Sequence, residues 1–156
     1  IHSFPPRRSS DLWPSSPHHL RTTMHSFDLA TDRNGLFDIT VPISTTVGGS
    51  GITEGLLVVS VPHSTAAVTV ASHWDPLGLE DIDDEIRRLV PTRIDFKHQV
   101  DTPQDAAGHV KAAIIGHSRA FSISEGKLIL GTSQRIFFWE FDAPRTRHFH
   151  VQIIGA

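Results

Sequence analysis

The sequence contains no cysteine and only one methionine, Met24. Without cysteine the chain can form neither disulfides nor thiolate–metal bonds, so any metal site must use histidine and carboxylate side chains. The formal net charge of −3 gives no general attraction for nucleic acid. No apolar run approaches the roughly 18 residues needed to span a bilayer. We therefore expect a cytoplasmic protein without a nucleic-acid or membrane partner.

The chain has 156 residues, which suits one domain with a hydrophobic core. Its first part, residues 1–23, has no apolar periodicity and is rich in proline, serine and arginine. Such a composition is typical of a disordered or non-native extension, and the segment lacks the apolar core of a secretory signal. We predict that the native chain starts at Met24 and that residues 24–156 form a single domain.

Several short runs are rich in β-branched and apolar residues and are bounded by turn residues, which is typical of strands. The predicted strands are 36–43, 55–61, 66–71, 120–124, 127–130, 134–141 and 148–154. Glu125-Gly126 separates two of them and favours a hairpin turn. The first strand is expected to run into a loop rich in serine, threonine and glycine.

Two segments carry helix signals. The first has Asp75 as a capping residue, Pro76 in the first turn and an apolar stripe that ends before Pro91. The second begins at Thr102-Pro103, with an acidic residue at the third position, and ends at Gly116. Hairpin strands with two interleaved helices indicate an α+β domain.

Eleven histidines provide an ample supply of metal ligands. His63, His98 and His109 each lie at the boundary of a predicted element, and three imidazoles with one open position suit Zn²⁺. Asp105 is four residues before His109, so both lie on one face of the helix. The spacing alone leaves open that these are unrelated polar residues, because no HExxH-like motif is present.

Two further pairs have a functional and an ordinary interpretation. Arg145 and Arg147 flank a proline-containing turn and either bind an anion or remain solvated. His148 and His150 share one face of a strand, and we interpret them as a polar sheet face rather than as metal ligands.

Several motifs occur together and in a fixed order: PHSTAAVTV, the helix after Asp75, the His98-x10-His109 spacing, GKLILGTSQ and EFDAPR. On these motifs the chain resembles the YjbQ-like family, which is linked to secondary thiamine-phosphate synthase activity. The resemblance covers about Phe37 to Gly155. It implies an α+β domain with a half-barrel-like sheet and two helices, assembled as a homotrimer with sites near the subunit boundaries.

Ten positions match the family's motifs, namely His63, Asp75, His98, His109, Gly131, Thr132, Gln134, Asp142, Pro144 and Arg145. At five positions the usual Glu, Asn, Asn, Trp and Gly are replaced, in turn, by Ser72, His73, Asp105, Ser133 and Ala143. The loss of a carboxylate and an amide at positions 72 and 73 favours weakened or altered chemistry.

The resemblance also implies roles for the matching residues. His63, His98 and His109 would hold a divalent metal such as zinc. Asp105 departs from the family pattern, but it shares a helix face with His109 and would orient that ligand from the second shell. Asp75 and Arg145 would be catalytic, while Gly131, Thr132, Gln134 and Arg145 would bind a small phosphorylated substrate. The implied reaction joins a pyrimidine methyl diphosphate to a thiazole phosphate and releases pyrophosphate. Alternatives are a non-catalytic trimeric module that binds a metal and a phosphorylated ligand, and a metal-dependent hydrolase.

Overall fold

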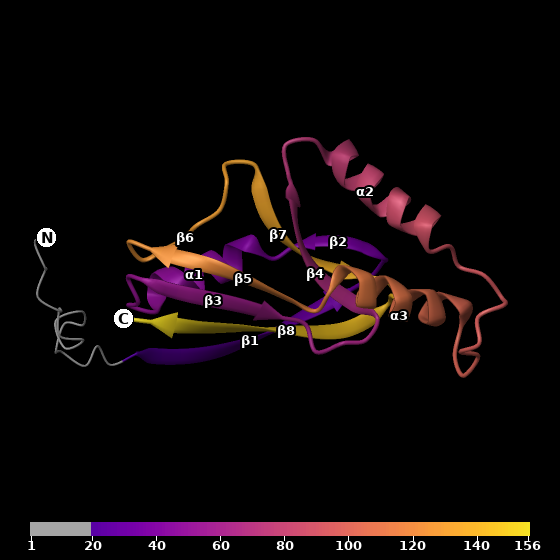
Figure 1. Ribbon diagram of the computed structural model, residues 1–156, viewed down its shortest axis with the longest axis horizontal. Coiled ribbons are helices and arrows are strands. Elements are labelled where there is room, and N and C mark those ends of the chain that lie inside the picture. Colours follow the sequence, from indigo (N-terminus) through magenta and orange to yellow (C-terminus); the bar gives the residue numbers. More distant parts are fainter. Residues whose placement is uncertain (1–19) are drawn as a thin grey trace, which may run out of the picture.

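The computed structural model describes residues 20–156 (Figure 1). The prediction for residues 1–23 therefore lies almost wholly outside the described residues, and the domain boundary at Met24 stays a prediction. The first strand already begins at Arg21, which pairs with Gly155. Within residues 20–156, every helix is too short or too polar to cross a membrane.

The strands form two antiparallel sheets. The larger has the order β1-β8-β3-β5-β6 and the smaller the order β2-β7-β4. Their bounds are β1 Arg21–Thr31, β2 Gly35–Asp38, β3 Gly55–Ser60, β4 Ala66–Ser72, β5 Ser118–Ser124, β6 Lys127–Leu128, β7 Gln134–Glu140 and β8 Arg145–Gly155. The sheets curl into a half-barrel within one α+β domain, which confirms the predicted fold class (Figure 1).

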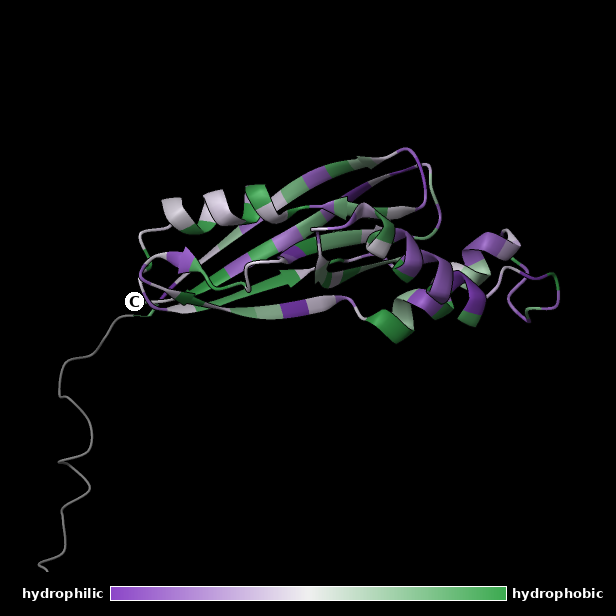
Figure 2. Cartoon of the chain, turned by 90° about the horizontal axis from the view of Figure 1, so that it is seen from above, coloured by the Kyte–Doolittle hydropathy of each residue, from purple (hydrophilic) through white to green (hydrophobic). Residues whose placement is uncertain are grey.

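Three helices accompany the sheets: α1 Thr40–Gly49, α2 Pro76–Leu89 and α3 Pro103–Ile115. The two predicted helices are confirmed as α2 and α3. Their caps are also as predicted, because Asp75 accepts a hydrogen bond from the Leu77 amide and Thr102 accepts one from the Asp105 amide. In Figure 2 the hydrophilic colour is prominent on these two helices, which lie at the opposite end of the molecule from α1.

The prediction of a strand over 36–43, and with it the count of two helices, is wrong. The strand β2 stops at Asp38, whose carboxylate accepts a hydrogen bond of 2.8 Å from the Thr40 amide, and α1 follows. The β-branched residues of α1 have poor helix propensity, which amounts to less than about 0.7 kcal/mol each. Burial of Ile43 and Val47 outweighs this, since each such side chain contributes about 1.5–3 kcal/mol.

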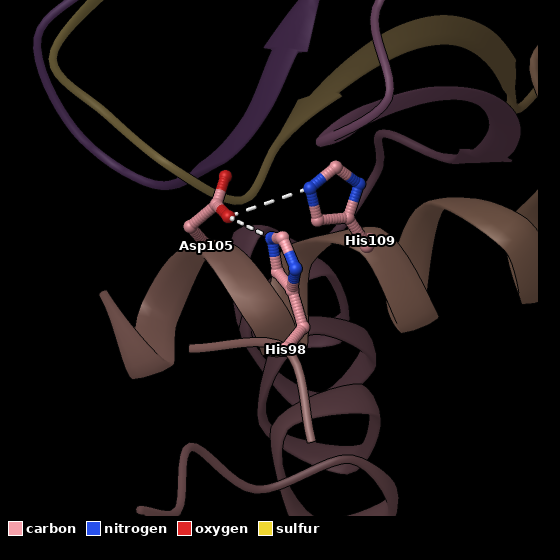
Figure 3. A group of neighbouring side chains, drawn as sticks. All are labelled: His98, Asp105 and His109. Atoms are coloured by element: carbon pink, nitrogen blue, oxygen red, sulfur yellow. Dashed lines mark hydrogen bonds and ion pairs between the residues drawn. The ribbon is translucent and has the colours of Figure 1, made fainter. Parts of the chain in front are cut away.

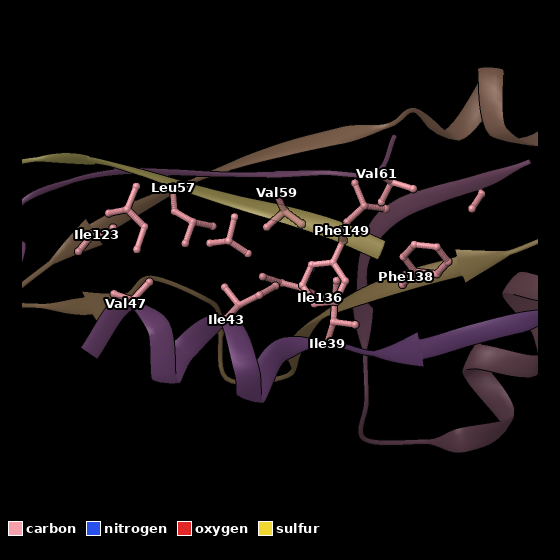
Figure 4. Packing of buried hydrophobic residues seen from close by; sticks show 14 of the residues in the cluster. Ile39, Ile43, Val47, Leu57, Val59, Val61, Ile123, Ile136, Phe138 and Phe149 are labelled. Carbon is pink, nitrogen blue, oxygen red and sulfur yellow. The ribbon is translucent and has the colours of Figure 1, made fainter. Parts of the chain in front are cut away.

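The main core fills the space between α1 and the strands (Figure 4). Ile39, Ile43 and Val47 recur every fourth residue and point toward Leu57 of β3 and Phe149 of β8. The four-residue spacing places all three on one face of the helix. The core therefore selects a helix for a segment whose composition suggests a strand.

A second, smaller core fixes α2 and α3 against the smaller sheet. It contains Ala67 of β4, Trp139 and Phe141, which pack with Ile86 of α2 and Ala112 of α3. This packing places the first turn of α3 beside the turn that joins β7 to β8.

Candidate functional site

The first turn of α3 and the loop before it bring two histidines and an aspartate together (Figure 3). The Oδ2 atom of Asp105 lies 3.1 Å from Nε2 of His98 and 3.4 Å from Nε2 of His109. The two imidazole rings stand edge-on, with centroids 5.2 Å apart. One ligand atom from each residue lies within 4.8 Å of the others. The predicted pairing of Asp105 with His109 is present, and Asp105 contacts His98 as well.

The local sequence explains this geometry. Thr102 caps α3 and Pro103 starts it, so Asp105 falls in the first turn and His109 one turn later. Asp105 is buried, whereas His98 and His109 remain partly exposed. The cluster thus consists of one buried carboxylate and two imidazoles that are partly accessible to solvent.

A hollow of about 630 Å³ opens beside the cluster. Its lining is mostly apolar, with Phe96 and Val110 among its residues, and His98 and His109 form part of its wall. Arg93 and Lys97 also line it, together with Asp95, which pairs with Arg93 at 3.2 Å. The Arg93 guanidinium lies 4.7 Å from the centre of the Phe96 ring. The hollow combines an aromatic surface, positive charge and the histidine cluster.

A polar hollow of about 460 Å³ lies on the other side of the start of α3. Thr102, Gln104, Asp142 and Arg145 are among the residues that line it. Asp142 pairs with Arg145 at 2.5 Å, and this hydrogen bond raises the pKa of Arg145 above its usual value. The guanidinium is therefore cationic throughout the ordinary pH range.

A small hollow of about 110 Å³ shares His98 with the first hollow and Asp101 with the second. The histidine cluster and Arg145 therefore border neighbouring spaces around one helix start. Within residues 20–156 this is the place where the largest number of the predicted site residues meet.

His63 lies outside this cluster. Its Nε2 atom lies 3.0 Å from the backbone nitrogen and 3.1 Å from the backbone oxygen of His148, and the two rings pack with centroids 4.5 Å apart. Burial lowers the pKa of His63, and the charge of Arg147 adds to the effect. The imidazole thus meets the His148 backbone beyond the end of β3, where Pro62 has no amide to donate to the His148 carbonyl.

Asp75 caps α2, because its Oδ1 atom accepts a hydrogen bond of 3.0 Å from the Leu77 amide. In the GTSQ turn, Gln134 folds back so that its side-chain oxygen accepts a hydrogen bond of 2.7 Å from the Gly131 amide. Gly131 and Thr132 line a separate hollow of about 450 Å³ beside the start of α1.

The GTSQ turn and Arg145 lie at opposite ends of β7. That strand runs from Gln134 to Glu140, and seven residues of β-strand extend over roughly 20 Å. His73 belongs to the far end as well, because its Nδ1 atom hydrogen-bonds to the carbonyl of Ser133 at 2.8 Å. The predicted substrate-binding residues Gly131, Thr132, Gln134 and Arg145 therefore do not lie at one site within a single chain.

Three residues at or behind the site were given no role from the sequence, namely Gln104, Glu140 and the motif residue Asp142. Arg147, for which anion binding and a solvated position were left open, does neither, because it is buried against Glu140. A signal for the charged residues exists in EFDAPRTR, in which two acidic residues and two arginines alternate on either side of a proline turn. Alternation places each set on one side of its segment, so the turn between β7 and β8 brings them together.

Comparison with known proteins gives a consistent result. The family model described as UPF0047 protein YjbQ-like matches residues 25–156. The UPF0047 protein MJ1081 of Methanocaldococcus jannaschii is 41% identical over 123 residues, which are 79% of this chain and 87% of that protein. The UPF0047 protein YugU of Bacillus subtilis is 33% identical over 127 residues, or 80% of this chain and 93% of that protein.

Solved structures agree with these matches. A YbjQ-like protein of unknown function, SSO2532 from Sulfolobus solfataricus P2, superimposes with a TM-score of 0.84 at 35% identity and covers 88% of this chain and 100% of its own. The hypothetical protein APE1520 from Aeropyrum pernix K1 gives a TM-score of 0.80 at 39% identity, with coverage of 86% and 99%.

Proposed function

Because the chain belongs to the UPF0047 YjbQ-like family, we propose that it is a metal-binding enzyme that acts on small phosphorylated molecules. The observation that carries the proposal is the single Asp105 oxygen shared by two imidazoles beside a cation-lined hollow. The reaction to test first is the thiamine-phosphate-forming transfer that releases pyrophosphate.

The donor set fits a zinc-type ion. Zinc–nitrogen bonds of about 2.0–2.1 Å in a tetrahedral shell place neighbouring ligand atoms about 3.3 Å apart. The Asp105 oxygen lies 3.1 and 3.4 Å from the two imidazole nitrogens, which is close to this spacing, and the three ligand atoms all lie within 4.8 Å of one another. His98, His109 and Asp105 would hold the ion, which makes Asp105 a direct ligand rather than an orienting neighbour.

A bound ion would act as a Lewis acid on a phosphoryl oxygen and help neutralise a leaving diphosphate. Arg145 supports the same task from the neighbouring hollow, since Asp142 holds one of its terminal nitrogens and leaves the rest of the guanidinium for an anion. Phe96 and Val110 offer an apolar wall for an organic ring, and Lys97 attracts the negative charge of the ligand, whereas Arg93 is paired with Asp95.

A second candidate is a non-catalytic module that binds the same ligands. It is favoured by the pair Ser72 and His73, in which no carboxylate is present and the imidazole is bonded to Ser133 instead of facing the cluster. The two candidates share the binding site and differ in turnover.

We expect zinc-loaded protein to bind pyrophosphate, and Arg145→Met to weaken this binding by about tenfold or more, because a charge-assisted bidentate contact is lost. Isothermal titration calorimetry measures the pyrophosphate affinity. Arg119→Met is the control, because Arg119 donates to backbone carbonyls near the end of α3. Equal affinity in Arg145→Met would remove the anion site. Thiamine-phosphate formation above background would favour the enzyme, and binding without turnover would favour the module.

We also propose a homotrimer, which would bring the GTSQ turn of one chain toward the histidine cluster of another. Support comes from an apolar surface on the outer face of β1, β8 and β3, where Met24, Leu56 and Ile154 are 66%, 54% and 38% exposed. A soluble protein commonly covers such a patch with a partner.

Light scattering is expected to give about three times the chain mass of 17.2 kDa. Leu56→Glu should lower that mass, because a carboxylate would be buried in the contact. Leu89→Glu is the matched control, since Leu89 is an exposed apolar residue at the end of α2, outside the strands that form this face. A wild-type monomer at micromolar concentration would contradict the trimer.

A further inference from the structure

We propose that Glu140 and Arg147 are positioning residues, which hold Arg145 in a fixed place relative to the start of α3. The inference rests on the proposed anion site at Arg145. It assigns a purpose to a buried ion pair that neither contacts the histidine cluster nor lines either neighbouring hollow.

Glu140 is fully buried and its carboxylate accepts five hydrogen bonds. Arg147 donates two of them, at 2.7 and 2.6 Å, and the hydroxyl of Thr31 donates a third at 2.8 Å. The backbone amides of Phe141 and Asp142 donate the other two, at 3.1 and 2.9 Å. The carboxylate thus fixes the backbone of the turn that leads from β7 to Arg145.

Asp142 connects this fixed turn to Arg145 and to α3. Its Oδ2 atom pairs with the Arg145 guanidinium, and its Oδ1 atom accepts a hydrogen bond of 3.3 Å from the Gln104 side chain. Gln104 immediately precedes Asp105 in the first turn of α3. A shift of the Asp142 backbone would therefore move Arg145 relative to the histidine cluster.

Arg147 makes a second connection to α3, one turn further along. It donates a hydrogen bond of 2.8 Å to the hydroxyl of Thr65, whose carbonyl accepts the Phe141 amide at 3.1 Å. The Thr65 side chain packs on Gly108, where an added Cβ would lie only 3.2 Å from two Thr65 carbons. Gly108 directly precedes His109. The ion pair is therefore linked to α3 at two places, beside Asp105 through Asp142 and Gln104, and beside His109 through Thr65 and Gly108.

Stability alone does not account for this arrangement. A buried ion pair is often no more stabilising than apolar side chains of similar volume, because both charges lose their hydration. The four charged groups form two nested pairs across the turn that joins β7 to β8. The inner pair, Asp142–Arg145, borders the polar hollow, and the outer pair, Glu140–Arg147, is buried behind it. The outer pair sets the geometry of the inner one.

The test uses Arg147→Lys, which keeps the charge but loses the two parallel hydrogen bonds of the guanidinium. Pyrophosphate affinity of the zinc-loaded protein is expected to fall about tenfold, while zinc affinity stays within about twofold. In an Arg145→Met background, Arg147→Lys should cause no further loss, because the two residues then act as one unit.

Val151→Ala serves as the stability-matched control, since Val151 is a fully buried residue of β8 outside the network. It should lower the melting temperature and leave pyrophosphate affinity unchanged. Unaltered affinity in Arg147→Lys, an additive loss in the double variant, or an equal loss in Val151→Ala would overturn the positioning role.

Amide hydrogen exchange separates this inference from the proposed function. Arg147→Lys should speed exchange at Phe141 and Asp142 more than Val151→Ala does, whether or not an anion binds. If wild-type protein fails to bind pyrophosphate, the anion site is wrong and the exchange result alone decides. Unchanged exchange at those two amides would then reject the positioning role.

Discussion

Replacing His109 with alanine is expected to lower the zinc affinity of the purified protein by about 100-fold or more. Loss of a residue that merely supports a ligand costs about 10–100-fold in metal affinity, and loss of a direct ligand should reach at least the upper end of that range. His98→Ala should behave alike, because both imidazoles face the same oxygen of Asp105. Competition titration with a chromophoric chelator measures the affinity, and elemental analysis gives the stoichiometry.

His117→Ala is the matched control. His117 is an exposed histidine that follows the end of α3 and lies outside the cluster, and its backbone carbonyl, which accepts the Val61 amide, is kept in the variant. It should keep the wild-type zinc content. Wild-type zinc affinity in both His98→Ala and His109→Ala would rule out a metal at this cluster and leave Asp105 as a hydrogen-bonding partner of two histidines.

The predicted third histidine ligand is decided by the same titration. The Nε2 atom of His63 is held by the backbone of His148, at 3.0 Å from its nitrogen and 3.1 Å from its oxygen, so only Nδ1 is left for a metal. We expect His63→Ala to retain zinc, which would restrict the site to His98, Asp105 and His109. A loss equal to that of His109→Ala would instead establish the three-histidine site inferred from the sequence, and His63 would then have to leave its place beside β8.

Local signals were sufficient to predict α2 and α3. Asp75, Thr102 and the prolines that follow them define each start without reference to the rest of the fold. The helix α1 could not be predicted this way, because its β-branched composition favours a strand and only burial of Ile43 and Val47 selects a helix. Tertiary packing there overrides local preference.

The candidate site was predictable to a similar extent. The pairing of Asp105 with His109 follows from four-residue spacing within one helix. The approach of His98 depends on the path of the irregular loop before α3, and the position of Arg145 depends on the turn from β7 to β8, which connects the two sheets. Neither distance is encoded in local spacing, so the sequence could name these residues but not place them.

The second large effect concerns Glu140 and the stability of the fold. Replacing Glu140 with glutamine is expected to lower the free energy of unfolding at neutral pH by about 3–5 kcal/mol, because Arg147 would be left as a buried charge without a counter-ion. Urea unfolding followed by circular dichroism measures the change. Glu54→Gln is the control, because Glu54 is an exposed glutamate that also accepts two hydrogen bonds, and it should change stability little.

The pH dependence gives an independent check of the same carboxylate. Burial alone would raise the pKa of Glu140, but the hydrogen bonds from Arg147, the Asp142 amide and Thr31 outweigh it and hold the pKa below the ordinary value of 4.5. A carboxyl group with a lowered pKa stabilises the fold fully above its unfolded-state value, and this contribution is lost as the pH falls through the folded value. Wild-type stability should therefore decline steeply as the pH falls below about 4.5.

Glu140→Gln should lack this part of the decline, so its stability and that of the wild type converge in acid. His63 contributes a separate loss that begins at higher pH, because burial lowers its pKa from 6.5, and the charge of Glu140 acts on that pKa as well. Both unfolding curves are therefore measured in a His63→Ala background. The difference between the two unfolding curves therefore isolates Glu140. If the two curves stay parallel from pH 7 to pH 3, Glu140 is not ionised in the folded chain. The proposed role of the Glu140–Arg147 ion pair behind Arg145 would then be wrong.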